Sequence, residues 1–330
     1  FGAGVILMHD RASAAGRGWA GLHYRRMGVL WLIGVVHAYL FWDGDILVSY
    51  AFCGLLLFLF RKVRPGRLLI TGLIFLVVGS GLMILGGVSA PYWGEDQFTE
   101  FNAEWQPTEE KLEEELAAMT GSWLGEIKHR APKVLEMHLF IIPYYMFWRG
   151  IGMMLLGMAF FRWGWLPGEA SWRLYATLIV LGLVVGLPLT AIGIHRQIAS
   201  DWEPVYSFFF ASQFGYWGSI LIALGYVGGV MLLFRAKIWQ NLTMRFAAVG
   251  RMAFTNYLLQ TIICTTLFYG RGFGLFGEVE RIGQAGIVIL VFVFQLAYSP
   301  VWLRHFRFGP AEWLWRSLSY GSRQPMRRDR

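Results

Sequence analysis

The sequence predicts an all-α, polytopic integral membrane protein, a bundle of transmembrane helices. Its 330 residues are 56% hydrophobic and only 15% charged, with a mean hydropathy of +0.48, which lies outside the range of soluble globular proteins. The apolar runs are continuous rather than alternating, as expected of helices that satisfy their own backbone groups. The net charge of +8 comes from arginines clustered at the ends of these runs. Such clusters set membrane topology and attract anionic lipid, so we expect no nucleic-acid partner.

A partial first helix and about eight complete spans are predicted. Phe1–Met8 reads as the tail of a helix whose beginning we expect upstream. The basic stretch Arg11–Arg26 faces the cytoplasm by the positive-inside rule, and Arg61–Arg67 returns to the same side. This alternation sets the following predicted spans: Met27–Trp42, Ile46–Phe60, Leu68–Gly87, Met137–Phe161, Leu174–Ile194, Tyr206–Phe234, Arg251–Tyr269 and Ile282–Leu303.

The remaining polar segments are treated as additions to a single transmembrane domain that covers residues 1–330. The only long one, Val88–Glu136, is expected outside as an acidic cap, with an amphipathic helix at Glu109–Met119. The basic tail, residues 304–330, is expected to carry an amphipathic helix on the inner leaflet. Cys53 and Cys264 fall inside apolar runs, which favours free thiols. No set of residues has metal-ligand spacing.

The turn between the first two complete spans is the strongest candidate site. Its sequence, HAYLFWDGDILVSY at His37–Tyr50, places Asp43 and Asp45 close to His37 at the end of an apolar run. Ionisable residues within membrane helices are functional candidates. The alternative is that both aspartates solvate a loop and that His37 fills an interface. Asp45 can also serve as the N-cap of the following helix.

Four further polar residues interrupt the apolar runs. Arg149 lies about a dozen residues into its span, near mid-membrane, so it must face the bundle interior and meet a carboxylate, a carbonyl or water. Arg251 stands at the inner end of a span, where a positive-inside flank is the alternative reading. Asn256 and Gln260 share one helix face, either to join neighbouring helices or to line a channel. The glycine-rich stretch Gly270–Gly277 has no preceding strand, which argues against a nucleotide loop.

Three segments resemble the signature segments of the YeiB-like family of bacterial inner-membrane proteins, known as domain of unknown function 418. They are HAYLFWDGDILVSYAFCGLL from His37, GRMAFTNYLLQTIICTTLFYG at Gly250–Gly270 and GPAEWLWRSLSYGSRQP at Gly309–Pro325. They stand in the family's order over most of the chain. The family's opening helix, with its polar Arg-Gly motif, has no counterpart here, so any catalytic group on that helix is outside the predicted site.

The resemblance implies acyl transfer, because this family is grouped with a wider superfamily of transmembrane acyltransferases. Such enzymes move an acyl group from cytosolic acyl-CoA, with acetyl-CoA favoured here, to a hydroxyl or amine of an extracytoplasmic acceptor such as a glycan or a small metabolite. By this reading His37 is the general base, because imidazole exchanges protons near neutral pH, and Asp45 or Asp43 orients it. Tyr39, Ser49 and Tyr50 are the nearby hydroxyl groups considered as partners.

The acyl donor would be held by Arg149, Arg251, Asn256 and Gln260. Arg149 is expected at the pantetheine amides and Arg251 at a CoA phosphate. The predicted site includes no metal. A homodimer is one possible oligomeric state. The main alternative is a membrane transporter or exporter, in which the same buried Asp, His and Arg side chains form a path for protons or substrate. A scaffold whose polar groups only pack is the third reading.

Overall fold

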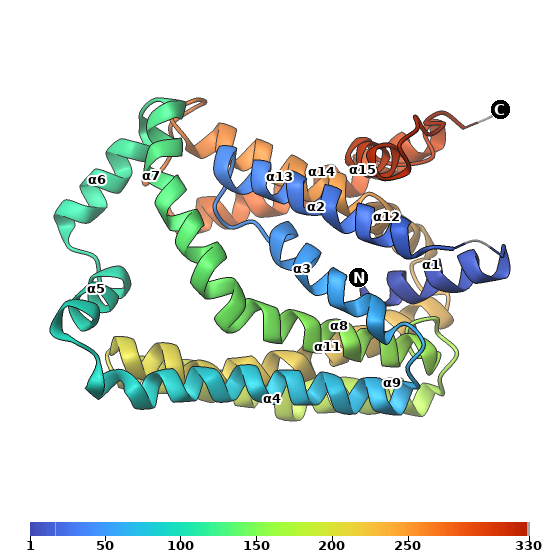
Figure 1. Cartoon of the computed structure of the whole chain (residues 1–330), viewed down its shortest axis with the longest axis horizontal. Coiled ribbons are helices and arrows are strands. Elements are labelled where there is room, and N and C mark those ends of the chain that lie inside the picture. Colours follow the sequence, from blue (N-terminus) through green and yellow to red (C-terminus); the bar gives the residue numbers. More distant parts are fainter. Residues whose placement is uncertain (17, 329–330) are drawn as a thin grey trace. The chain divides into compact units, whose positions relative to one another are not determined.

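The computed structural model describes residues 1–16 and 18–328, so Arg17, Asp329 and Arg330 of the predicted basic segments lie outside the described residues. Within that part the chain is helical and has no strand, only an isolated bridge between Phe306 and Arg327 (Figure 1). The described α-helices are α1 Gly2–Ala14, α2 Ala20–Leu40, α3 Leu47–Leu57, α4 Pro65–Ser89, α5 Glu95–Trp105, α6 Glu109–Thr120, α7 Trp123–Glu136, α8 Phe147–Arg162, α9 Trp172–Leu181, α10 Leu187–Ala199, α11 Ser212–Arg235, α12 Gln240–Arg251, α13 Ala253–Phe268, α14 Arg281–His305 and α15 Pro310–Tyr320.

Several of these helices are continuous with short 3₁₀ or π-helical stretches. Phe58–Phe60 extends α3 and Ala90–Tyr92 extends α4 as 3₁₀ turns. The π-helical stretches join α7 to α8, join α9 to α10 and precede α11; they are Met137–Met146, Gly182–Gly186 and Tyr206–Ala211. The predicted span at Met137 is therefore not a helix start, because the helical run begins at Trp123.

The apolar helices confirm a multi-pass membrane protein. In the described chain, five helical runs are long and apolar enough to cross a membrane; they are Pro65–Tyr92, Trp123–Arg162, Trp172–Ala199, Tyr206–Arg235 and Arg281–His305. The other three predicted spans are also helical. Leu47–Phe60 and Ala253–Phe268 are apolar but shorter, and α2 is more polar because its first turns carry Arg25 and Arg26. All eight predicted segments are helices, and five of them are both long enough and apolar enough to cross a membrane.

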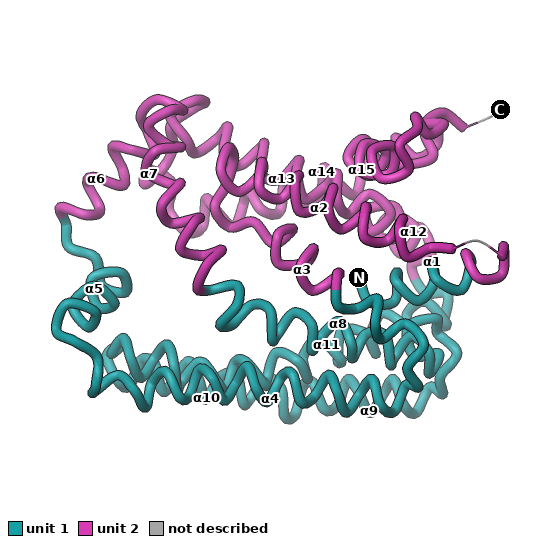
Figure 2. The backbone as a smooth tube through the Cα atoms, viewed as in Figure 1, with its two compact units in different colours: residues 1–11, 56–109, 141–238 teal, residues 12–55, 110–140, 239–330 magenta. Residues whose placement is uncertain are grey.

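The chain forms two compact units, coloured separately in Figure 2. Unit 1 comprises residues 1–11, 56–109 and 141–238. Unit 2 comprises residues 12–55, 110–140 and 239–330. The predicted acidic cap is divided between them, since α5 belongs to unit 1 and nearly all of α6 to unit 2. A single domain over 1–330 stays a prediction.

Unit 1 is held together by glycine contacts between neighbouring helices. A Cβ atom added at Gly152 of α8 would lie 2.7 Å from Cγ of Leu76 and 3.0 Å from the carbonyl oxygen of Gly72, both on α4. Gly182 and Gly225 face each other in the same way between the α9–α10 run and α11. Helices in lipid lack a hydrophobic drive to associate, so close backbone approach at small residues supplies the packing energy.

Gly152→Ala should therefore destabilise unit 1 by about 1–3 kcal/mol, the usual cost of overpacking. The matched control is Gly157→Ala on the same helix, where an added Cβ meets nothing within 4 Å. That change should be neutral or should stabilise by up to about 1 kcal/mol, because alanine is the better helix former. Thermal unfolding of the two purified variants in one detergent measures the difference, and equal melting temperatures would contradict the close-packed interface.

Unit 2 packs the predicted tail helix against the helix that carries His37. The tail helix is present as α15, and its Trp315 packs beside Leu30 of α2 and Leu47 of α3. The Trp315 indole donates to the carbonyl oxygen of Arg26 at 2.8 Å. Glu312 of α15 accepts the backbone N–H groups of Phe254 and Thr255 at 2.8 and 3.0 Å. These N–H groups begin α13 and have no partner within their own helix, so α15 fixes α13 as well as α2.

Candidate functional site

His37 and Asp45 form a buried pair in unit 2. His37 lies in the last turn of α2, and Asp45 precedes α3. The imidazole Nδ1 is 2.7 Å from Oδ2 of Asp45, and the two residues are 4% and 1% exposed. The other carboxylate oxygen, Oδ1, accepts the backbone N–H of Val48 at 3.0 Å and so caps α3. Capping and orienting had been considered as alternatives for Asp45, and its two oxygens perform both.

Two hydroxyl groups of α13 complete this pair. Nε2 of His37 lies 3.0 Å from Oγ1 of Thr261. The Tyr257 hydroxyl donates to Oδ2 of Asp45 at 3.4 Å and accepts the backbone N–H of Ile46 at 3.3 Å. With the Nδ1 proton donated to the carboxylate, Nε2 is the acceptor and Thr261 the donor, an assignment made from the network. We call His37, Asp45, Tyr257 and Thr261 the histidine cluster.

The sequence had suggested other hydroxyl partners for the histidine. Thr261 and Tyr257 were missed because they lie more than two hundred residues along the chain from His37. The signal that could have found them is their spacing of four on one face of an apolar helix, the same spacing that singled out Asn256 and Gln260.

Asp43 is not part of the histidine cluster. It is half-buried in the turn and forms no hydrogen bond with His37 in the described chain. Of the two aspartates, the structure brings only Asp45 to the imidazole.

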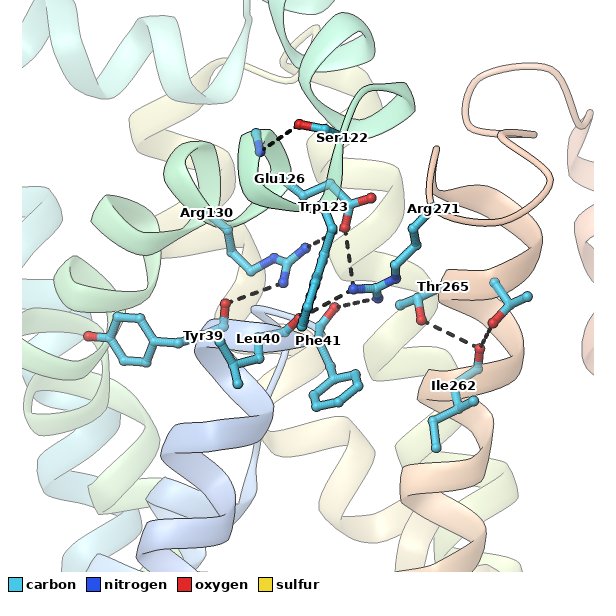
Figure 3. Close-up of polar contacts among 12 residues, drawn as sticks. Tyr39, Leu40, Phe41, Ser122, Trp123, Glu126, Arg130, Ile262, Thr265 and Arg271 are labelled. Carbon is cyan, nitrogen blue, oxygen red and sulfur yellow. Dashed lines mark hydrogen bonds and ion pairs between the residues drawn. The ribbon is translucent and has the colours of Figure 1, made fainter.

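A second polar cluster holds the end of α2, one turn beyond His37. Arg271 donates to the carbonyl oxygens of Leu40 and Phe41, both at 3.3 Å, and the Trp123 indole donates to Leu40 at 3.0 Å. Arg130 of α7 reaches the carbonyl oxygen of Tyr39 at 3.5 Å. Figure 3 shows the two guanidinium groups approaching from different elements, with Glu126 above them. We call Trp123, Glu126, Arg130 and Arg271 the α2-end clamp.

Glu126 supplies the negative charge of the α2-end clamp. Its Oε2 lies 3.5 Å from Arg130 and 3.4 Å from Arg271. The side chain of Glu126 is 0% exposed and that of Arg130 is 1% exposed, so both charges are removed from solvent. The last carbonyl groups of a helix have no partner within it, and here the buried Arg130, the half-buried Arg271 and an indole satisfy them. None of these residues was identified from the sequence.

The glycine-rich loop at Gly270–Gly277 brings Arg271 into the clamp. The Gly270 N–H donates to the carbonyl oxygen of Met119 at 2.8 Å, at the end of α6. A Cβ atom added at Gly270 would lie 2.0 Å from the carbonyl oxygen of Thr120, so only glycine permits this approach. Gly270 therefore allows two backbone segments to pack closely, a role that does not involve a nucleotide.

Glu126→Ala should destabilise the protein by about 3–5 kcal/mol, because it leaves the buried Arg130 and the half-buried Arg271 without their counter-charge. The control is Glu115→Ala, which removes an acid paired with Lys133 at 3.5 Å, with both side chains about two-fifths exposed. Such an exposed pair contributes only about 0–1 kcal/mol. Thermal unfolding in detergent compares the two variants. A loss for Glu126→Ala no larger than that of the control would exclude a stabilising role for the clamp.

Arg149 belongs to unit 1 and meets the partners expected of a membrane arginine. Its Nη1 donates to the carbonyl oxygen of Tyr216 at 3.2 Å, and its Nη2 donates to the Ser219 hydroxyl at 2.9 Å. The guanidinium carbon also lies 4.4 Å from the centre of the Tyr216 ring. These contacts satisfy a half-buried cation without a carboxylate. A role for Arg149 at an acyl donor stays a prediction.

Asn256 and Gln260 join α13 to α14. Gln260 donates to the Gln295 side chain at 3.1 Å, and Gln295 donates to the carbonyl oxygen of Asn256 at 3.1 Å. The Asn256 amide donates to the Ser299 hydroxyl at 3.2 Å. Each contact is of the kind that holds neighbouring helices together in lipid. The Asn256 Oδ1 is buried and has no partner in the described chain. A role in lining a donor channel stays a prediction for both residues.

Arg251 lies in an open pocket of unit 2. The pocket, of about 330 Å³, is formed by α12, α14 and the end of the tail, with Arg304 and Arg328 also in its wall. Guanidinium groups bind phosphate through paired N–H donors, so these residues suit the phosphate contact expected of Arg251.

Comparisons with known proteins agree on one family. The family described as "Protein of unknown function (DUF418)" matches residues 160–322. The chain is similar to "Uncharacterized protein YeiB" of Escherichia coli (strain K12), with 34% identity over 98% of this chain and 80% of that protein. It is also similar to "Uncharacterized protein YxaH" of Bacillus subtilis (strain 168), with 33% identity over 99% and 78%. No solved structure shows a significant match. These matches show that the chain belongs to the YeiB-like family, DUF418.

Proposed function

We propose that the protein is a transmembrane acyltransferase that moves an acyl group from acyl-CoA to a hydroxyl or amine of an acceptor, with His37 as general base. The observation that carries the proposal is the histidine cluster. Nδ1 of His37 is fixed by Asp45 at 2.7 Å, and Nε2 faces a hydroxyl oxygen at 3.0 Å. A base whose second nitrogen is held by a carboxylate is kept in one tautomer, which acyl transfer to a hydroxyl group requires.

The reaction needs one proton to be removed and returned. His37 Nε2 takes the proton of the acceptor as the acceptor oxygen or nitrogen attacks the thioester carbonyl. The new C–O or C–N bond forms, the C–S bond breaks, and the CoA sulfur takes the proton from the imidazolium. Asp45 stabilises the imidazolium while it holds the proton. In this scheme the Thr261 hydroxyl occupies the position of the acceptor hydroxyl before the acceptor binds.

The proposed topology follows from the distribution of arginines. The basic ends of the spans face the cytoplasm of a bacterial inner membrane, from which the acyl donor arrives. The His37–Asp45 turn then lies toward the extracytoplasmic side, where the acceptor binds. Arg149, Asn256 and Gln260 are proposed to line the donor's path, and Arg251 to meet its phosphate. This arrangement brings together an activated donor and an acceptor that does not enter the cell.

His37→Gln should reduce the release of CoA from acetyl-CoA by about 10²–10⁴-fold, the usual contribution of a general base. The assay uses purified full-length protein in proteoliposomes with hydroxyl and amine acceptors. His305→Gln is the control, because His305 is an exposed histidine whose ring contacts the Val301 carbonyl at 3.1 Å, outside the histidine cluster. If both variants have wild-type turnover, the proposed base is wrong. Acceptor movement without any acetyl-CoA consumption would favour the transporter reading.

Substitutions at Thr261 distinguish direct transfer from an acyl-enzyme. Thr261→Val keeps the shape of the side chain and removes the hydroxyl, whereas Thr261→Ser keeps the hydroxyl. If Thr261 only holds Nε2 until the acceptor arrives, as we propose, Thr261→Val should keep turnover within about tenfold of wild type. Loss of turnover in Thr261→Val with rescue in Thr261→Ser, together with a labelled acyl group on the wild-type chain, would instead identify Thr261 as the nucleophile.

A further inference from the structure

The pocket that contains Arg251 is built from three separate parts of unit 2. Arg251 is the last residue of α12, Arg304 lies in the last turn of α14, and Arg328 belongs to the tail. The rest of the wall consists of aliphatic and apolar side chains, namely Met244, Ala247, Ala248, Pro300 and Leu303. Three cations thus share the wall with apolar side chains, and among the described residues no acidic side chain lines the pocket.

The tail is fixed to the end of α14 by backbone contacts. The Arg328 N–H donates to the carbonyl oxygen of His305 at 3.1 Å, and the Arg307 N–H donates to that of Met326 at 2.9 Å. Phe306 and Arg327 form the antiparallel bridge between them. Two of the wall residues, Ala248 and Leu303, form a buried cluster with Met252 that joins α12 to α14. The position of each arginine backbone is therefore set by packing and backbone hydrogen bonds.

None of the three guanidinium groups has a counter-charge in the described chain. The ion pairs found there involve other cations. Within residues 1–16 and 18–328, the side chains of Arg251, Arg304 and Arg328 also form no hydrogen bond. The ends of two helices contribute only partial negative charge, which offsets part of the repulsion. Three like charges in one pocket, with no carboxylate among the described lining residues, produce a positive field there.

We propose that this pocket is a binding site for a phosphate group, held by Arg251, Arg304 and Arg328. A phosphate monoester carries up to two negative charges and several acceptor oxygens, so it can accept paired N–H donors from more than one arginine. At about 330 Å³ the pocket is at the lower limit of small-molecule sites, which suits one phosphate group and the atoms next to it. The apolar side chains of the wall suit a ligand that continues into an uncharged portion.

Two kinds of ligand carry this chemistry at a membrane protein. One is the phosphate of the CoA donor, an identification that rests on the proposed function. The other is an anionic phospholipid headgroup, which requires no catalysis. The phosphate site itself depends on neither source.

The experiment measures binding to purified full-length protein in nanodiscs of phosphatidylcholine. Adenosine 3′,5′-bisphosphate, which has a 3′-phosphate and lacks a thioester, is titrated by calorimetry. In a second arm, phosphatidic acid is added to the nanodiscs and its retention is measured by native mass spectrometry. Arg251→Gln and Arg304→Gln should each weaken binding of the recognised probe by about tenfold or more, equal to about 1.4 kcal/mol. Arg304→Lys should weaken it less, because it keeps the charge and loses the paired donors.

Arg281→Gln is the matched control, because it removes an exposed arginine from the other end of α14. Its affinity for either probe should equal that of wild type. If binding of the nucleotide is weakened by the pocket substitutions, the ligand is the CoA donor. If only the retention of phosphatidic acid is weakened by them, the ligand is a phospholipid headgroup. The proposal is overturned if neither probe binds, or if Arg281→Gln weakens binding as much as Arg251→Gln. Because no thioester is present, these outcomes do not depend on whether His37 catalyses acyl transfer.

Discussion

The geometry of the histidine cluster depends on how the end of α2 is held. A helix leaves its last carbonyl groups without partners, and inside a membrane protein no bulk water satisfies them. Here Arg130, Arg271 and the Trp123 indole donate to the carbonyls of Tyr39, Leu40 and Phe41. His37 lies one turn before these carbonyls, so the clamp fixes the backbone from which the imidazole projects. Both cations of the clamp are in turn paired with the carboxylate of buried Glu126.

The same constraint explains why one aspartate matters more than the other. Asp45 is fixed by capping α3, so its free oxygen has a defined position toward His37. Asp43 caps no helix in the described chain and lies half-buried in the turn. A carboxylate that is needed for the start of a helix is already ordered, and ordering a side chain only for an imidazole would cost conformational entropy. The dual use of Asp45 therefore connects the fold of α2 and α3 to the proposed chemistry.

The sequence predicted the parts of the fold that depend on composition and on the periodicity of hydrophobic residues. All eight predicted spans are helices, the tail helix is present, and His37 meets Asp45. It did not predict Thr261, Tyr257 or the clamp, because these are contacts between segments far apart in the chain. Glu126 was read as part of a solvated acidic cap, since a local pattern does not reveal a guanidinium from residue 271. The helix start at Trp123 was missed because α7 is polar and becomes apolar only beyond Glu136.

The arginines of this chain differ in whether the protein itself supplies their partners. Arg130 is buried and paired with a carboxylate, and Arg149 is half-buried and satisfied by a carbonyl and a hydroxyl. A charge in a low-dielectric interior is unfavourable unless it has partners, and the protein itself supplies the partners of both arginines. Arg251 is different, because it is exposed, has no protein partner in the described chain and shares its pocket with Arg304. A positive-inside flank, the alternative reading of Arg251, would account for arginines at helix ends but does not require them to share one pocket with apolar side chains. That shared pocket is the feature that a phosphate-bearing ligand explains.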